Sequence, residues 1–558
     1  MDSNLLKTKS IEQLVGDVEH GSKALKRSLT AWDLTLLGIG GIIGTGIFVL
    51  TGTAAANQAG PAIMMSYLFA GLACGFAALC YAEFASMIPI AGSAYTYAYA
   101  TMGELFAWII GWDLILEYAV GSMTVAIGWS GYMQKLLSGA GITLPLWMSA
   151  APSASSPGTL VNLPAVIIVL CIMYLLVVGV RESARFNAVM VGIKLAAVLF
   201  FIGAGAVYVK PENWDPFTPY GWSGVMGAAG VVFFAYIGFD AVSTTAEEAK
   251  NPQRDLPIGI IASLVVCTTL YLIVAAVLTG IVPVVDYKAD QAFLNAPVAF
   301  ALSLIGQDWA AYLVSAGAVA GITSVLLVML MSQPRIFFAM SRDGLLPQAV
   351  SKVHPKFGTP YITTIITCIV VALVAGVTQI QTVGEMTSIG TLFAFAIVCG
   401  AVLILRVSRP EVHRPFRVPF GPVFPLLGIL SCVYLMLNLP VLTWIRFLVW
   451  LDLGMLIYWF YGRTHSPLVD ARESAGRSTF ESVANFVFMA GALAVFNTAC
   501  ITVLAYMTEL GLTTETIAKW HEIGVTAEAA DAFGLKWLGV SLVSLAAGFG
   551  MRKAAASK

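Results

Sequence analysis

The amino-acid sequence predicts an all-α integral membrane protein with about fourteen transmembrane helices, and three observations support this fold class. The 558-residue chain is 58% apolar and only 11% charged, whereas about 25% of the residues in soluble globular proteins are charged. Its apolar residues form runs of the roughly 20 residues that an α-helix needs to cross a bilayer. Lysine and arginine gather in alternate segments between these runs.

The predicted spans follow one another along most of the chain. They lie near residues 33–54, 61–88, 103–134, 161–180, 186–209, 221–246, 257–283, 297–333, 360–379, 384–405, 421–441, 443–462, 482–507 and 534–551. The third and eighth runs exceed the length of one span, so we expect part of each to tilt or to extend beyond the lipid. The mildly polar, aromatic segment 89–105 suits a re-entrant or surface helix.

The distribution of lysine and arginine predicts the orientation in the membrane. If the amino terminus is inside, the inner segments hold 23 of these 30 residues and the outer segments hold six, while Lys194 lies within a span. Cytoplasmic segments are enriched in lysine and arginine, so both termini are predicted to be cytoplasmic. The charged first thirty residues lack the apolar core of a signal peptide. We expect a multi-pass protein of the plasma (cell inner) membrane.

Glycine interrupts two of the predicted spans. The first contains five glycines in GIGGIIGTGIFVL, from Gly38 to Leu50. Each glycine costs about 1 kcal/mol relative to alanine inside a helix, and a bilayer offers no water to satisfy freed backbone groups. The sixth run, FFAYIGFDAVSTT, carries Gly238 and Asp240 in mid-span. Paired broken helices in corresponding halves of a chain indicate the central site of a transporter.

The interrupted spans also predict the domain organisation. They open two halves of five spans each, which we expect to be related by an inverted twofold. The predicted regions are a cytoplasmic N-terminal segment (1–30), a ten-helix transport core (31–408), two additional spans (409–465), and a C-terminal pair of spans with a short tail (466–558). Prolines keep the basic loop after the tenth span out of helix.

Three long motifs in the expected order carry a resemblance to a known family. They are LKRSLTAWDLTLLGIGGIIGTGIFVLTG, FFAYIGFDAVSTTAEEAKNPQRDLPIGI and QPRIFFAMSRDGLLP. The chain, over roughly residues 20–462, resembles a bacterial-type member of the cationic amino acid transporter family, within the amino acid–polyamine–organocation superfamily. The resemblance implies a LeuT-type 5+5 inverted-repeat core with a substrate site at the bilayer midplane.

The chemistry of an amino acid zwitterion matches these helix breaks. Amides at Thr45 and Gly46, at the positive end of the resumed helix, suit the carboxylate. Carbonyls released at Ile42, Phe234 and Ile237 suit the ammonium, and matching positions of similar transporters contact the substrate backbone. The predicted substrate-binding residues are Ile42, Ile43, Gly44, Thr45, Gly46, Phe234, Ala235 and Ile237.

Two of these assignments have a structural alternative. Gly40 and Gly44 have the GxxxG spacing that lets membrane helices pack closely, so packing would explain the glycines without a binding site. Phe234 occupies a position at which relatives often place an aromatic gate over the bound substrate. A lipid-facing or core phenylalanine is the alternative there.

Lys194 lies in the middle of the fifth span. A lysine at that depth costs at least about 2.5 kcal/mol on insertion scales, and snorkelling is difficult because the residue is about eight positions from the start of the span. Some sodium-independent relatives look as though a fifth-span lysine replaces a sodium ion between the first and eighth spans. We therefore predict that Lys194 couples transport to protons, with the Gly41 and Ile42 carbonyls as acceptors.

Glu117 and Asp240 are the other charged residues deep in predicted spans, and intramembrane acids are candidates for function. Glu117 is predicted to take part in proton coupling, or else to lie in a water-filled vestibule. Asp240 is predicted to influence specificity, or else to cap the resumed half of the sixth helix.

Gly321, Val325 and Met329 recur at helical spacing along the eighth span, and we expect them to meet the substrate side chain. Cationic-substrate members of the family tend to be smaller at the position that aligns with Met329. A bulky Met329 would close the pocket to arginine and lysine, unless it is only a core filler. The sequence therefore predicts a preference for small neutral amino acids such as alanine, glycine and serine.

Together these features predict a sodium-independent, proton-coupled secondary transporter of amino acids. A cationic amino acid uniporter or exchanger is the alternative, and a non-transporting amino acid sensor is a further one. The five histidines fall in polar loops or tails, so we expect no enzyme, metal site or cofactor. The expected partners are the amino acid substrate, protons and membrane lipids, with no nucleic acid; the sequence identifies no protein partner.

Overall fold

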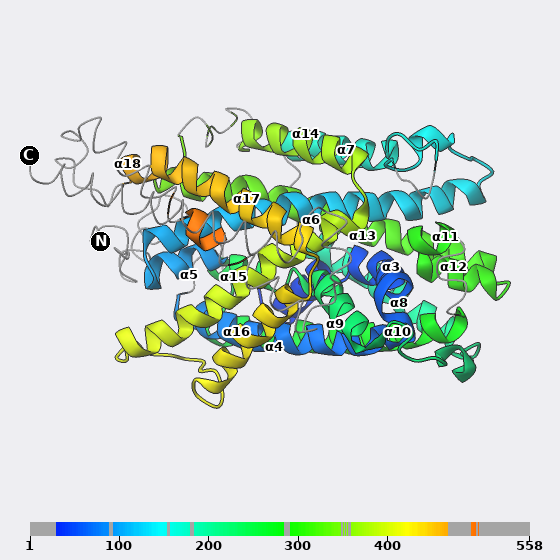
Figure 1. Ribbon diagram of the computed structural model, residues 1–558, viewed down its shortest axis with the longest axis horizontal. Helices are drawn as coiled ribbons and strands as arrows, with labels where there is room; N and C mark the ends of the chain where they lie inside the picture. Colours follow the sequence, from blue (N-terminus) through cyan, green and yellow to red (C-terminus); the bar gives the residue numbers. More distant parts are fainter. Residues whose placement is uncertain are drawn as a thin grey trace, which may run out of the picture.

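Helices are the regular elements of the part of the chain that the computed structural model describes (Figure 1). Apart from isolated positions, it describes residues 29–88, 93–152, 157–178, 184–283, 291–347 and 359–466. The predicted N-terminal segment and the last two predicted spans therefore lie almost entirely outside the described residues.

Twelve predicted spans fall on helices of the described chain. The longer helices are α4 (Ile63–Met87), α6 (Glu104–Gly139), α8 (Ala184–Ala206), α10 (Pro252–Ile281), α13 (Asp308–Arg342), α15 (Ile380–Ser408) and α17 (Val441–Ile457). The shorter ones are α2 (Ala31–Ile42), α3 (Thr51–Ala54), α5 (Ser93–Thr101), α7 (Leu163–Val178), α9 (Gly221–Val232), α11 (Gln291–Asn295), α12 (Pro297–Leu304), α14 (Tyr361–Val377), α16 (Val423–Leu437) and α18 (Arg463–His465). By length and composition, seven continuous helical stretches of the described residues could cross a bilayer.

Two elements differ from the sequence-based expectation. The eighth run does not form one long helix from residue 297, because Gly306 adopts a φ of 75° and turns the chain between α12 and α13. Helix α5 forms within the segment expected to be re-entrant or superficial, but Tyr97 and Tyr99 on it are buried. This short helix therefore belongs to the core of the bundle rather than to its surface.

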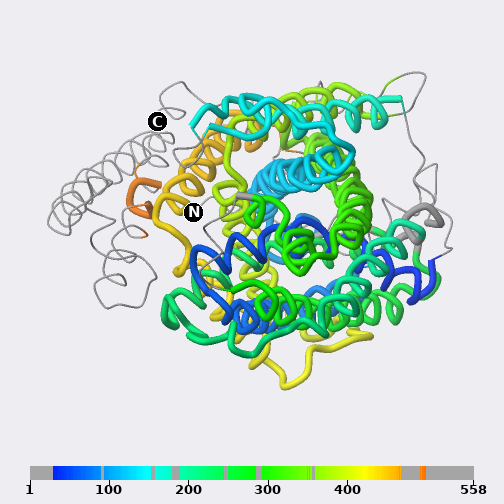
Figure 2. The backbone as a smooth tube through the Cα atoms, turned by 90° about the vertical axis from the view of Figure 1, so that its right-hand side faces the viewer, coloured from blue at the N-terminus to red at the C-terminus, as the bar shows by residue number. Residues whose placement is uncertain are grey.

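The helices pack as a bundle of roughly parallel elements, which Figure 2 shows end-on. Helix α13 packs along α6, and α10 packs along both α4 and α2. Helices α7 and α14 lie side by side at the top of Figure 1. The two interrupted spans are thus enclosed between α4 and α10 on one side and α6 and α13 on the other.

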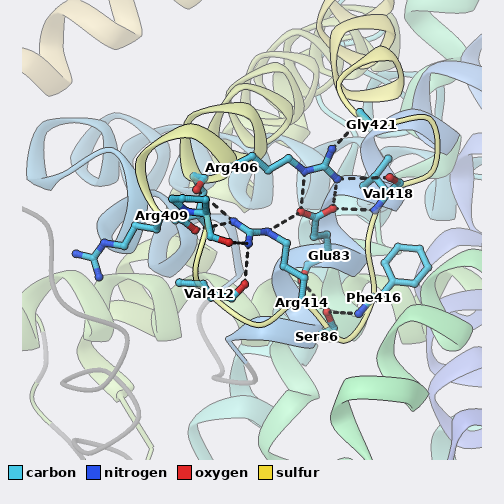
Figure 3. Close-up of polar contacts among 11 residues, drawn as sticks. Glu83, Ser86, Arg406, Arg409, Val412, Arg414, Phe416, Val418 and Gly421 are labelled. Atoms are coloured by element: carbon cyan, nitrogen blue, oxygen red, sulfur yellow. Dashed lines mark hydrogen bonds and ion pairs between the residues drawn. The ribbon is translucent and has the colours of Figure 1, made fainter.

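A buried carboxylate organises the connection between α15 and α16 (Figure 3). Glu83, 1% exposed on α4, forms an ion pair with Arg406 of α15 and lies 3.5 Å from Nε of Arg414. The backbone amide of Val418 donates to the same carboxylate at 2.8 Å, and that of Phe416 donates to the Ser86 hydroxyl at 3.3 Å. The non-helical segment 409–422 is therefore held against α4.

Candidate functional site

The first span is broken in mid-course. Helix α2 ends at Ile42, and Ile43 is extended, with φ −73° and ψ 106°. The chain resumes as a wide π-type turn at Gly46–Leu50 before α3. The glycine-rich sequence thus breaks the helix, as its composition predicts, and the break is buried: Ile43 is fully covered and Thr45 is 1% exposed.

The sixth span is broken by a different geometry. Helix α9 tightens into a 3-10 turn at Phe233–Tyr236, and Ile237 is extended, with φ −60° and ψ 134°. Gly238 then adopts a φ of 120°, a conformation that residues with a Cβ rarely adopt. A second 3-10 segment, Asp240–Glu248, follows. The break lies where the sequence places Gly238 and Asp240.

The two breaks touch through their backbones. A Cβ at Gly41 would lie 3.0 Å from the Gly238 carbonyl oxygen, and a Cβ at Gly238 would lie 2.6 Å from the Gly41 carbonyl carbon. A Cβ at Gly46 would overlap the Ala235 backbone. Close packing and helix breaking are therefore not alternatives here, because the glycines at these positions serve both.

Tyrosine hydroxyls hold several of the backbone carbonyls at the breaks. Tyr271 of α10 lies 2.9 Å from the carbonyl oxygens of both Ile42 and Ala235, one in each broken span. Tyr67 of α4 donates to the Gly46 carbonyl at 3.1 Å. Sequence reasoning missed both residues. The available signal was that a buried tyrosine hydroxyl usually finds a hydrogen-bond partner, but nothing in the sequence names that partner.

The carbonyls of Ile42 and Phe234, which are predicted to bind the substrate ammonium, already have protein partners. The Ile42 carbonyl accepts from Tyr271, and the Phe234 carbonyl accepts from the Ile237 amide at 3.2 Å. A carbonyl oxygen has two lone pairs, so each retains one for a further donor. The Phe234 side chain is buried, 4% exposed, within the described residues. Its role as a gate stays a prediction.

Lys194 connects three of the core elements. Its side chain is fully buried on α8 and donates from Nζ to the Gly40 carbonyl at 2.5 Å. The acceptor therefore precedes by one residue the pair that the sequence predicts, Gly41 and Ile42. A Cβ at Gly321 of α13 would lie 2.6 Å from Cγ of Lys194, so the aliphatic stem lies against the eighth span. Full burial rules out snorkelling.

Three acidic side chains are buried in this part of the molecule. Glu117 and Asp113 lie one helical turn apart on α6, and Asp240 begins the segment after the sixth-span break. Asp240 accepts a hydrogen bond from the Gly238 amide at 3.2 Å. This contact reaches back to the break and does not cap the resumed segment, whose N-cap is Phe239 without a side-chain bond. The role of Asp240 in specificity stays a prediction.

One face of α13 contacts Lys194, the first-span break and α6 in succession. Val325 lies against Gly44, where a Cβ would come within 3.1 Å of Cγ2. One turn further on, Met329 places its sulfur over Gly121 of α6, 3.3 Å from where a Cβ would stand. Gly121 follows Glu117 by four residues and shares its helix face. Met329 therefore covers the α6 face that carries Glu117.

Comparison with known proteins identifies the family of the chain. The amino acid permease family model matches residues 29–461. The branched-chain amino acid permease BcaP of Bacillus subtilis (strain 168) is 53% identical over 469 residues, covering 84% of this chain and 100% of the relative. The methylthioribose transporter of the same organism is 50% identical over 466 residues, covering 84% and 99%.

More distant relatives include the cationic amino acid transporters. The vacuolar cationic amino acid transporter 4 of Arabidopsis thaliana is 31% identical over 589 residues, covering 84% of this chain and 97% of the relative. These relatives are permeases and transporters rather than enzymes. The chain belongs to the amino acid permease family, within the amino acid–polyamine–organocation superfamily.

Proposed function

We propose that this protein is a secondary active amino acid transporter of the plasma membrane that works by alternating access. The contact between the interrupted first and sixth spans at Gly41 and Gly238 carries the proposal. Two broken helices bring backbone donors and acceptors to one place at mid-membrane. A zwitterionic amino acid requires both at once, whereas a structural membrane helix requires neither.

The substrate backbone would occupy the breaks. The amides of Thr45 and Gly46 would hold its carboxylate, and the free lone pairs on the carbonyls of Ile42, Phe234 and Ile237 would accept from its ammonium. A LeuT-type core of two inverted five-helix halves accounts for interruptions five spans apart. In this arrangement both termini are cytoplasmic, as the distribution of lysine and arginine favours.

We assign neutral L-amino acids as substrates, with alanine, glycine and serine ahead of arginine and lysine. Met329 fills the space over Gly121, one turn along α6 from Glu117, whose charge would otherwise attract a cationic side chain. The 53% identical relative named as a branched-chain permease supports a neutral aliphatic substrate and extends the range to larger side chains.

A ligand panel tests the substrate class directly. Purified protein is heated with alanine, serine, valine, leucine, arginine, lysine or methylthioribose, the last because of the 50% identical relative. Neutral amino acids are expected to raise the melting temperature, since a ligand stabilises the folded state that binds it. Stabilisation by methylthioribose alone would contradict an amino acid substrate. Saturable uptake into proteoliposomes then separates a transporter from a sensor, which binds without accumulating.

Replacing Met329 with serine sharpens the assignment. Met329→Ser frees volume beside Glu117, so arginine should become a ligand of the variant in the same melting assay. The control is Met331→Ser on the same helix. Unchanged selectivity in Met329→Ser would mean that Met329 only fills the core.

We further propose that transport is coupled to protons rather than sodium through Lys194. A charge crossing 100 mV is worth about 2.3 kcal/mol, enough for roughly fifty-fold accumulation. A pH gradient without sodium should drive uptake into proteoliposomes, and Lys194→Ala should abolish that response while still allowing exchange of internal for external substrate. A Lys194→Ala protein with the same gradient response would remove Lys194 from this role.

A further inference from the structure

An apolar groove in two neighbouring parts runs along the exposed face of α10, and its inner end at Gly71 lies against the Tyr236 hydroxyl of the sixth span. Its first part, about 780 Å³, lies at the amino-terminal end of α10 and is closed on one side by Pro415 and Phe416. Its second part, about 360 Å³, lies between α10 and α4. Both parts are lined by Ile261 and Val265, so they adjoin along one face of α10 and together are called the α4–α10 groove.

The length of the groove matches one leaflet of a bilayer. It begins at Arg254 and reaches Thr268, fourteen residues further along α10, which is about 21 Å at 1.5 Å per residue. Half of the hydrocarbon core of a membrane is about 15 Å. The groove therefore extends from the headgroup region through the depth occupied by one acyl chain.

The chemistry of the groove changes along its length. Arg254 and Gln253, both exposed, stand at its mouth, and the exposed Arg417 follows Phe416 in the chain. Further in, the lining is almost wholly apolar, and Val265 is 59% exposed. A cationic end joined to a long apolar channel complements an anionic headgroup joined to an acyl chain.

Hydrogen bonds to α4 hold the wall beside the mouth of the groove in place. Phe416 and Val418 donate their amides to Ser86 and Glu83 of α4 (Figure 3). Along the second part, the Phe76 ring packs on Phe424 of α16, with ring centroids 5.4 Å apart. The groove is thus preformed, which lowers the entropic cost of holding a flexible chain.

We propose that the α4–α10 groove is a binding site for an anionic phospholipid of the adjoining leaflet, with the phosphate at Arg254 and an acyl chain against Ile261 and Val265. This site lies outside the residues predicted to bind the substrate and does not depend on the identity of the transported substrate. Arginine is well suited to phosphate because its guanidinium matches the oxygen geometry.

Photolabelling of the full chain tests the site. The protein is reconstituted in phosphatidylcholine liposomes that contain a phosphatidylglycerol with a diazirine on its acyl chain, and labelled peptides are mapped by mass spectrometry. Labelling of the α4 and α10 peptides is expected, together with competition by unlabelled phosphatidylglycerol. A matched phosphatidylcholine probe that labels these peptides equally would show a non-specific lipid contact and overturn the proposal.

Paired variants localise the two halves of the ligand. Val265→Trp fills the channel and should reduce labelling to the level of the exposed face of α14, whereas Leu373→Trp, on that face at 66% exposure, should not. Ile261→Trp gives an independent second block. Arg254→Gln should lower the preference for phosphatidylglycerol about fivefold. Arg409→Gln should leave it unchanged, since Figure 3 shows the Arg409 side chain directed away from Phe416.

Chemical cross-linking separates this ligand from protein occupants. Cross-links from the groove to a second copy, or to residues 467–558 of the same chain, that persist in phosphatidylglycerol liposomes would assign the groove to protein and overturn the proposal. Melting temperatures of all variants in detergent, matched to the unmodified chain, ensure that lost labelling reports lost binding.

Discussion

The interruptions in the first and sixth spans differ in what holds them open. In the first span, three backbone carbonyls accept hydrogen bonds from side chains of α8, α10 and α4. In the sixth span, the amides of Ile237 and Gly238 donate within the same segment, to Phe234 and Asp240. The first break is therefore held by side chains of three other helices, and the second combines these local bonds with contacts to α10 through Tyr271 and to α4 through Tyr236.

This difference indicates which broken span is suited to change conformation. A segment held by side chains of other helices changes its energy whenever those helices shift, because packed interfaces have discrete alternative arrangements. A segment held by local bonds keeps its shape through such shifts. The energy of the first span thus depends most on the position of its neighbours, whereas the sixth span has local bonds besides its contacts with α10 and α4.

The largest effect on stability is expected from Gly238→Ala, which alters the break in the sixth span. Alanine at a φ of 120° is strained, and its Cβ would overlap the Gly41 backbone, so unfolding stability should fall by about 3 kcal/mol. Gly192→Ala on α8, where a Cβ meets open space, should change it by no more than about 1 kcal/mol. Chemical denaturation in detergent measures both. Equal effects would show that the sixth-span geometry is not fixed by Gly238.

A smaller effect is expected from Tyr271→Phe, which removes a side-chain support that reaches both breaks. Losing a hydroxyl bonded to buried carbonyls should cost about 2 kcal/mol and weaken substrate affinity in the melting assay. Tyr95→Phe is the matched control, because its buried hydroxyl donates to Asp343, away from both breaks. Identical substrate affinities in the two variants would argue against external support of the breaks.

The smallest effect is expected from Asp240→Asn. An asparagine oxygen can still accept from the Gly238 amide, so stability should change by less than about 1 kcal/mol, whereas Asp240→Ala leaves that amide unpaired and should cost about 1–3 kcal/mol. If the asparagine variant loses as much stability as the alanine variant, the charge of Asp240 stabilises the sixth-span break rather than its hydrogen bond with the Gly238 amide.

The sequence was sufficient to locate both breaks, because five glycines crowd the first span and Gly238 is followed by Asp240 in the sixth, whereas isolated glycines and acids lie within the continuous helix α6. It was not sufficient to find Tyr271, which reads as one more aromatic in an apolar run and acts on Ile42, 229 positions away in the chain. Predicting such a bond requires the rotation of each helix about its axis.

The same limit applies to the charged residues. The depth of Lys194 predicted its burial, but its acceptor proved to be Gly40 rather than Gly41 or Ile42, a difference set by helix rotation. Glu83 gave no sign of its partner Arg406, because 323 positions separate them. Composition thus predicts where polar groups enter the membrane, and packing decides which groups they meet.

Tyr271 carries one hydroxyl hydrogen but lies within 2.9 Å of two carbonyl oxygens. A single hydrogen cannot form two full-strength bonds, so at any moment one broken span is tied to α10 more firmly than the other. Rotation of one C–O bond, without displacement of any helix, exchanges the two. The Tyr271 hydroxyl therefore has two alternative hydrogen-bonded orientations at the centre of the protein, and exchange between them requires no rearrangement of the backbone.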